Sequence, residues 1–290
     1  YPNQKESKIS WNEAKNIVVN AYSEFDDRFG KIANLFFENS WIHAQVKKGK
    51  TSGAFSHPTV PSCHPCILIN YQGKIRDVMT LAHELGHGIH QYLANKNGVL
   101  LAETPLTLAE TASVFGEMLT FKSMLNNSQF KDQKNSLLRS KIEDMLNTVF
   151  RQVAFFKFER EVHLKRSYGE LTEEEIGKIW MDTQQESLGS SIKFNDNYKY
   201  FWAYIPHFIH SPFYVYAYAF GDCLVNSLYK KFEDGDADFK EKYYELLEAG
   251  GSVHYQTHLS KFKLDPKRQD FWQLGMNLIK NLMDDLEKLS

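Results

Sequence analysis

Apolar side chains recur at three- and four-residue spacing along most of the chain, which is the pattern of amphipathic helices. One such run begins at Ser10, where Ser10 and Glu13 form a capping box, and extends to about Asn39 with a break expected near Gly30. A longer run covers residues 132–167. Its expected core positions are Leu138, Ile142, Met145, Val149, Val153 and Phe156. The chain is therefore predicted to be mainly α-helical.

The rest of the chain continues this pattern. Thr172 is expected to cap one helix, and others are expected over residues 213–232, residues 238–249 and from about residue 267 to the carboxy terminus. No internal repeat, low-complexity tract or long linker divides the sequence. Residues 1–290 are therefore expected to form a single unit.

Two short segments, residues 53–56 and 66–70, have the composition of strands amid the helices. They predict a small β-sheet. An extended ligand could add to an exposed edge of such a sheet through main-chain hydrogen bonds. A hairpin that only supports its neighbours is an equally good interpretation of the second strand.

The most informative motif is HExxH, formed by His83, Glu84 and His87 within residues 81–90. Four residues advance an α-helix by about 6 Å and 40°, so the two imidazoles lie one turn apart on one face. They can then bind one cation, with Glu84 beside them as a base for a water molecule. The motif predicts a zinc peptidase. The alternative is a core helix whose two histidines have ordinary hydrogen-bond partners.

A catalytic zinc ion takes three protein ligands and keeps one position open, so HExxH requires a third ligand. His90 is excluded, because seven helical residues place it about 10 Å along the axis from His83. The metzincin arrangement, with a third histidine six residues after His87, is also excluded because that position is Leu93. The third ligand must come from another segment.

Glu110 is the predicted third ligand. Pro105 ends the preceding segment, and Thr107 is expected to cap a new helix with Glu110 in its first turn. A simple capping box between Thr107 and Glu110 is the alternative. Glu117 lies seven residues further on the same helical face, where two carboxylates together favour a cation. Glu117 is therefore expected to accept the free N–H of a ligating histidine.

In order and spacing, these motifs resemble those of the gluzincin oligopeptidases, the family of thimet oligopeptidase and bacterial oligoendopeptidase F. The matching stretches are residues 52–55, 65–71, 77–87 and 110–113, together with the aromatic block described below. The resemblance implies a multi-helix zincin-type catalytic domain with a small β-sheet next to the HExxH helix. It also implies that His83, His87 and Glu110 bind one zinc ion per chain and that Glu84 is the general base.

The same resemblance implies a larger protein. Family members are about twice this length, and a helical amino-terminal half forms the other wall of a deep substrate channel. Here only 82 residues precede His83, and the first residue is Tyr1. Residues 1–290 are therefore expected to be the carboxy-terminal catalytic portion of a longer chain, with the missing amino-terminal half as a partner.

Residues 201–218 are unusually aromatic for a loop and are expected to line the site. The tetrahedral oxyanion of peptide hydrolysis needs a hydrogen-bond donor, and histidine and tyrosine are the usual ones. The family places such residues in the corresponding loop and helix. His207, placed in a loop by the preceding proline, and Tyr214 are the leading candidates, followed by Tyr218, and Tyr216 stays open. An aromatic helix packed in the core is the alternative for any single tyrosine.

The composition limits the classes of partner that the chain is expected to bind. With 42% hydrophobic residues and a net charge of −2, the chain can bury a sizeable core and is too balanced for a nucleic-acid binder. It contains no run of 18 apolar residues that would span a membrane. Cys63 and Cys66 form a lone CxxC for which a redox or second metal site is the less favoured interpretation. With Cys223, three free thiols indicate a reducing, cytoplasmic location.

These observations predict a zinc-dependent endopeptidase of short, unstructured oligopeptides, because the deep channel of the family excludes folded proteins. Glu84 is expected to take a proton from the attacking water and pass it to the leaving amine. Two alternatives stay open. One is a zinc carboxypeptidase, for which the sequence places no basic residue to hold a terminal carboxylate. The other is a metal-binding fragment that has no turnover in isolation.

Overall fold

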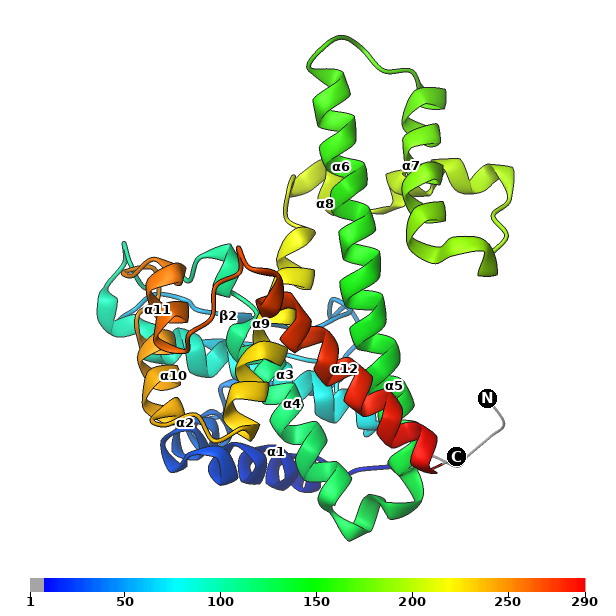
Figure 1. Ribbon diagram of the computed structural model, residues 1–290. Coiled ribbons are helices and arrows are strands. Elements are labelled where there is room, and N and C mark those ends of the chain that lie inside the picture. Colours follow the sequence, from blue (N-terminus) through cyan, green and yellow to red (C-terminus); the bar gives the residue numbers. More distant parts are fainter. Residues whose placement is uncertain (1–7, 290) are drawn as a thin grey trace.

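The computed structural model describes residues 8–289, so Tyr1 lies outside the described part. The structure is mainly helical with a small sheet, which confirms the predicted fold class (Figure 1). The α3 helix (Ile75–Ala94) carries HExxH and packs against α4 (Thr111–Asn126). The helices α1 (Trp11–Phe25) and α2 (Asp27–Glu38) pack beside this pair.

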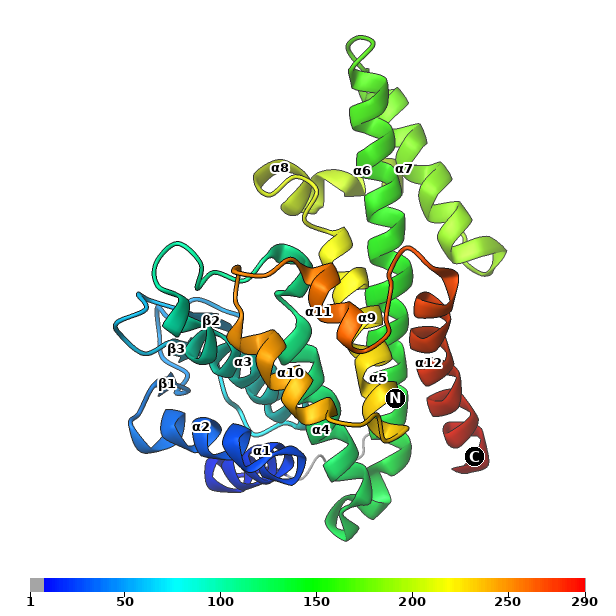
Figure 2. The same cartoon turned by 60° about the vertical axis from the view of Figure 1, so that its left-hand side comes forward.

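The remaining helices complete the body and an extension above it. They are α5 (Lys134–Leu146), α6 (Gln152–Arg166), α7 (Glu173–Leu188), α8 (His207–His210), α9 (Tyr216–Glu233), α10 (Phe239–Glu248), α11 (Tyr255–Lys261) and α12 (Gln269–Leu289). The helices α6 and α7 extend beyond the other elements in two views (Figures 1 and 2). Among residues 8–289, no helix combines the length and the apolar character needed to cross a lipid bilayer.

The sheet consists of β1 (Ile42–His43), β2 (Phe55–His57) and β3 (Cys66–Leu68) in the order β1-β3-β2. The two predicted strands are confirmed as β2 and β3, which pair antiparallel, whereas β1 was not predicted and pairs parallel to β3. The sheet lies against the HExxH helix, where the Ser56 hydroxyl donates to Gln91 Oε1 at 2.8 Å. The edge strand β2 therefore lies beside α3.

The first helical run breaks at Asp26, so the break predicted near Gly30 is wrong. Asp26 has an extended backbone and its side chain accepts the N–H of Arg28, which ends α1 and caps α2. Gly30 lies inside α2, at the point where α1 and α2 pack closely against each other. A Cβ atom at Gly30 would come within 2.0 Å of Ser23 Oγ. The capping box predicted at Ser10 is confirmed.

The long run over residues 132–167 is interrupted by a π-helical segment, Asn147–Arg151, which joins α5 to α6. Leu138, Ile142, Met145 and Val149 are buried as predicted. Val153 is 42% exposed, so its predicted core position is wrong. A π turn adds a residue and rotates the helix that follows, which shifts the buried face of α6 to Ala154, Phe155 and Phe158.

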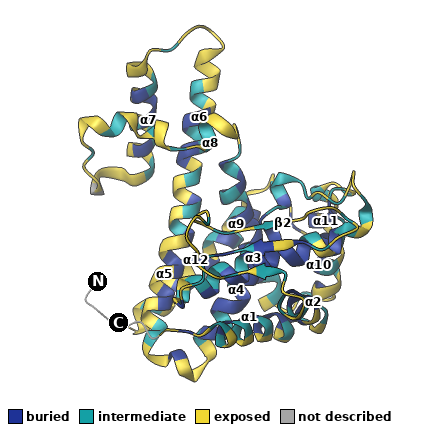
Figure 3. Cartoon of the chain, turned by 180° about the vertical axis from the view of Figure 1, so that it is seen from behind, coloured by how far each residue is buried: buried dark blue, intermediate teal, exposed yellow. Residues whose placement is uncertain are grey.

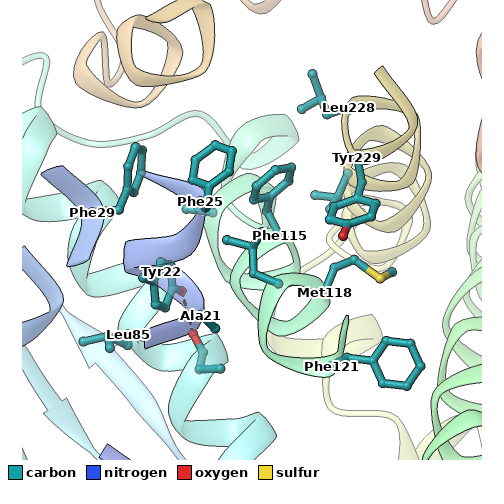
Figure 4. Close-up of a cluster of buried hydrophobic side chains, with 14 of the residues drawn as sticks. Ala21, Tyr22, Phe25, Phe29, Leu85, Phe115, Met118, Phe121, Leu228 and Tyr229 are labelled. Carbon is teal, nitrogen blue, oxygen red and sulfur yellow. Dashed lines mark hydrogen bonds between the residues drawn. The ribbon is translucent and has the colours of Figure 1, made fainter. Parts of the chain in front are cut away.

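Two separate clusters of buried apolar side chains hold these elements. The larger cluster includes residues of α1, α3, α4, α9 and α10. Within it, Phe25 packs on Phe115 (Figure 4), and Tyr243 of α10 packs on both rings. The smaller cluster lies between α6, α7 and the start of α9, and its buried members are Phe155, Phe158, Ile179, Trp180 and Val215. Much of the surface of α6 and α7 is exposed (Figure 3).

The helices α3 and α4 approach each other backbone to backbone at Gly86, in the middle of HExxH. A Cβ atom at Gly86 would lie 2.3 Å from the carbonyl oxygen of Ala112 and 2.7 Å from Ser113 Cα. Both are backbone atoms, which cannot move away by a change of rotamer. Only glycine allows this approach.

Gly86→Ala is therefore expected to lower the free energy of unfolding by on the order of 3 kcal/mol, because α4 must move away from α3. Chemical denaturation measures this loss. Gly177→Ala on α7 is the control, since a Cβ atom there would lie 3.2 Å from Lys199 Cβ and 3.3 Å from the Lys199 carbonyl oxygen, much farther than the 2.3 Å contact at Gly86. We expect that control to stay within about 1 kcal/mol of wild type. Equal stability of Gly86→Ala and wild type would contradict the close contact.

Candidate metal and catalytic site

His83 and His87 lie one turn apart on α3 and turn the same ring nitrogen toward each other. Their Nε2 atoms are 3.2 Å apart, and the two rings meet edge to face. The two imidazoles contact each other only through these Nε2 atoms. The arrangement leaves both Nε2 lone pairs available to one cation.

Glu110 completes this group from the start of α4. Its Oε2 lies 3.5 Å from His83 Nε2 and 3.4 Å from His87 Nε2. The helix begins at Thr111, so Glu110 occupies the capping position itself, and the prediction that Thr107 caps this helix is wrong. No capping box forms, and Glu110 Oε2 instead accepts the Ser113 hydroxyl at 2.8 Å.

The three side chains fit a tetrahedral metal. Bonds of 2.0 to 2.1 Å to a tetrahedral zinc ion require ligand atoms about 3.3 to 3.4 Å apart. The observed separations of 3.2, 3.4 and 3.5 Å match this value. Two imidazole nitrogens and one carboxylate oxygen are a donor set that suits zinc. Within the described residues, this is the group of histidine, cysteine and acidic side chains that could hold a metal ion.

Glu117 holds the far side of His83. Its Oε1 lies 2.5 Å from His83 Nδ1, and since a carboxylate only accepts, the imidazole donates Nδ1–H. This tautomer leaves the Nε2 lone pair free for a metal. Burial raises the pKa of Glu117, but the charge of Lys141 and the contact with His83 outweigh it and hold the pKa at about 2.

The site concentrates negative charge. Burial lowers the pKa of His83, but the hydrogen bond to Glu117 and the charges of Glu117, Glu110 and Glu84 raise it to about 9, so a metal ion that binds at neutral pH must displace the proton on Nε2. Burial likewise raises the pKa of Glu110, and His87, His83 and Ser113 together lower it to about 2. Three carboxylates held around two imidazoles favour a divalent cation.

Glu84 lies beside the triad without joining it, as the motif predicts. It is 6% exposed, and burial is the main cause that raises its pKa. Glu84 and His83 open onto a cleft of about 460 Å³. Gly53, Ala54 and Asn70, which belong to the two segments predicted to be strands, line the same cleft. The segments predicted to be strands therefore reach the site, although these residues flank β2 and β3.

The aromatic candidates lie in a second group. His207 Nε2 is 3.2 Å from the Tyr218 hydroxyl, and the Tyr214 ring lies between 5 and 6 Å from both rings. Tyr218 lies one turn before Gly221, which packs against Glu110 so closely that a Cβ there would meet Glu110 Cβ at 2.8 Å. Glu110 also contributes to the raised pKa values of Tyr214 and Tyr218, after burial as the main cause.

Three details of this block differ from prediction. The α9 helix begins at Tyr216 instead of Phe213, because Phe213 has a left-handed backbone with φ +61°. His207 belongs to the short helix α8 and not to a loop. Tyr216 packs its ring on Phe156 at 5.9 Å and lies outside the group of His207, Tyr214 and Tyr218.

The cysteines are unpaired. Cys63 and Cys66 are exposed and Cys223 is buried, and none forms a disulfide. Cys66 Sγ lies 3.6 Å from His64 Nδ1, but no third ligand joins them among the described residues.

A helical fold with a small sheet, in which a glutamate at the start of the next helix lies beside the two histidines of HExxH, is the arrangement expected of a metallopeptidase domain. Residues 5–278 match the model of peptidase family M3. The chain belongs to peptidase family M3.

Known relatives agree with this assignment. The oligoendopeptidase F homolog of Lactococcus lactis subsp. lactis is 32% identical over 87% of this chain, and the oligopeptidase PepF of Bacillus subtilis is 28% identical over 97%. The chain spans 42% of the length of each, and thus less than half of these relatives.

Solved structures share the fold. A peptidase structure from Chlamydophila abortus superimposes with a TM-score of 0.84 and 31% identity, and covers 99% of this chain and 48% of that one. Oligoendopeptidase-F from Enterococcus faecium has a TM-score of 0.70 and 21% identity over 98% of this chain and 44% of that one. The second likeness concerns the fold alone.

His90, excluded as a ligand, is a buried histidine behind the site. It is 2% exposed, and its Nε2 lies 3.3 Å from the Thr104 hydroxyl. Burial, and to a lesser degree the neighbouring His87, lower its pKa from 6.5 to about 3. Between about pH 3 and pH 6.5, His90 is therefore neutral in the folded chain and protonated in the unfolded chain.

His90 therefore contributes stability that is present above pH 6.5 and is lost as the pH falls toward 3. The size of the pKa shift corresponds to at most ~5 kcal/mol. Denaturation of the metal-free protein at pH 7 and pH 4 measures the loss. His90→Gln, which cannot titrate, is expected to lose less stability over this interval. An identical loss in both proteins would contradict the depressed pKa.

Proposed function

We propose that this chain is the catalytic part of a zinc-dependent endopeptidase that hydrolyses short, unstructured peptides. One zinc ion would be held by His83, His87 and Glu110. The observation that carries the proposal is the mutual separation of the three ligand atoms, 3.2 to 3.5 Å, in a chain of peptidase family M3. The three free thiols further support a reducing compartment such as the cytoplasm.

Bound zinc supplies a Lewis acid that polarises the scissile carbonyl and acidifies water. Glu84 performs the proton transfers. Its carboxylate takes a proton from the attacking water and later delivers that proton to the leaving amine. Burial raises its pKa and so makes the carboxylate a better base than an exposed glutamate.

His207, Tyr214 and Tyr218 are proposed to stabilise the oxyanion that forms on the substrate carbonyl. Their side chains lie against one another, and Tyr214 and Tyr218 both feel the charge of Glu110. An imidazole and two phenols are hydrogen-bond donors. The raised pKa values of Tyr214 and Tyr218 keep both phenols protonated at neutral pH, which a donor requires.

Substrate is proposed to lie extended in the cleft that His83, Glu84 and Asn70 line. The neighbouring edge strand β2 offers main-chain groups that bind a peptide without regard to its side chains. Such binding suits short peptides of varied sequence, because a folded protein cannot present an extended segment there.

The position of Arg76 favours internal cleavage over carboxypeptidase action. Arg76 lines the cleft on α3, seven residues before His83, which is about 10 Å of helical rise. An extended peptide spans this distance with about three residues. A carboxypeptidase needs its cation one residue from the scissile bond. Peptides with a free or an amidated carboxy terminus, assayed side by side, distinguish the two activities.

Glu84→Gln is expected to keep one zinc ion per chain and to lower turnover by about 10²- to 10⁴-fold, because it removes the base and not a ligand. Glu110→Gln is expected to lose zinc as well as turnover. Metal analysis and cleavage of a quenched peptide measure both effects. Normal activity of Glu84→Gln would exclude this mechanism, and zinc without cleavage in wild type would favour the metal-binding alternative.

Tyr218→Phe is expected to reduce kcat by about 10²-fold with little change in KM, because the lost hydroxyl acts on the oxyanion and not on bound substrate. Tyr216→Phe is the matched control, since this ring packs on Phe156. Steady-state kinetics on the same peptide compare the two. Similar kcat values for both variants would remove Tyr218 from the proposed donor group.

A further inference from the structure

Lys141 is a buried cation next to the candidate metal site. It comes from α5, and its side chain is 7% exposed. Its Nζ lies 3.3 Å from Glu117 Oε2. A buried ammonium group costs considerable free energy unless it is paired, so its presence there requires an explanation.

The contacts of Glu117 provide one. Its Oε1 lies 2.5 Å from His83 Nδ1, while its Oε2 contacts Lys141. Each carboxylate oxygen therefore has one partner, and the two contacts together fix the plane of the carboxylate. That plane in turn fixes the ring of His83. Without Lys141, the carboxylate keeps one contact and can rotate about it.

We propose that Lys141 is a positioning residue for the metal site, which it holds through Glu117 and His83. The inference rests on the proposed function, since it assumes that His83 binds a metal. Lys141 orients the carboxylate, the carboxylate selects the Nδ1–H tautomer, and Nε2 is left facing His87 and Glu110.

Other charges surround Lys141, and they define the competing explanation. Asp222 of α9 is buried, hydrogen-bonds to Asn226 at 2.9 Å and interacts electrostatically with Lys141, and Asp144 lies one turn after Lys141 on α5. Lys141 could thus serve only to neutralise Asp222 and join α5 to α9. That role would affect folding but would not depend on Glu117.

The test is the zinc affinity of Lys141→Met, measured by competition with a chromophoric chelator. We expect affinity to fall 10- to 100-fold, the range for loss of a group that orients a metal ligand. Lys141→Arg, which keeps the charge and a donor, is expected to recover most of it. The absorption spectrum of bound Co²⁺ is expected to change in Lys141→Met and to return in Lys141→Arg.

A double variant separates the two explanations. If Lys141 acts through Glu117, Lys141→Met adds nothing to the loss caused by Glu117→Gln. If it acts through Asp222, the two losses multiply. Lys122→Met is the control, because Lys122 also pairs with a glutamate, Glu233 at 3.0 Å, away from the site. Its zinc affinity is expected to equal that of wild type.

Zinc affinity of Lys141→Met within twofold of wild type would overturn the inference, as would multiplicative losses in the double variant. Circular dichroism shows whether Lys141→Met folds. If it does not, Lys141→Leu, which also lacks a donor, replaces it in both measurements with the same expectations. A wild-type chain that fails to bind zinc would instead overturn the proposed function, and the inference with it.

Discussion

The contact between the backbones of α3 and α4 at Gly86 is the constraint on which the candidate site depends. It brings the start of α4 against the middle of the HExxH helix. The carbonyl oxygen of Ala112 lies 2.3 Å from where a Cβ atom of residue 86 would be. Glu110, one residue before α4, can then reach both histidines with its carboxylate. A larger residue at position 86 would separate the carboxylate from the imidazoles.

A second consequence of this packing is that charge accumulates where water is largely excluded. Glu84 and Glu110 are both less than one-tenth exposed, and Glu117 lies behind His83. Such groups repel one another strongly in a medium of low polarity. The helices can hold them together because Lys141 from α5 and the histidines of α3 offset part of the charge. The remainder suits a divalent ion, and this links the stability of the body to the occupancy of the site.

Local rules in the sequence predicted much of the fold. The capping boxes at Ser10 and Thr172 and the helical spacing around His83 follow from short-range contacts, which the sequence displays directly. The side chains predicted as zinc ligands also lie together. They could be predicted because the HExxH motif requires a third ligand, and few residue types can supply it. Their roles stay predictions.

The remaining features depend on long-range packing. The apolar spacing does not indicate the π-helical segment at Asn147–Arg151, and it therefore does not predict which face of α6 is buried. The strand β1 is too short for any pattern. Lys141 reads as an ordinary polar position on α5, since its partner Glu117 is set by the angle between two helices. The start of α9 was misplaced because nothing in the sequence marks the left-handed backbone of Phe213.

The two apolar clusters differ greatly in size, and among the described residues the smaller one holds only five buried side chains. His83, His87 and Glu110 are anchored to the larger cluster, whereas His207 is followed by Phe208, which packs on the smaller one. Segments with fewer buried contacts open at lower free energy than the global transition. An opening confined to α6, α7 and α8 would withdraw His207 and leave the three proposed metal ligands in place. Amide hydrogen exchange in α6 and α7 would then be faster than in α3.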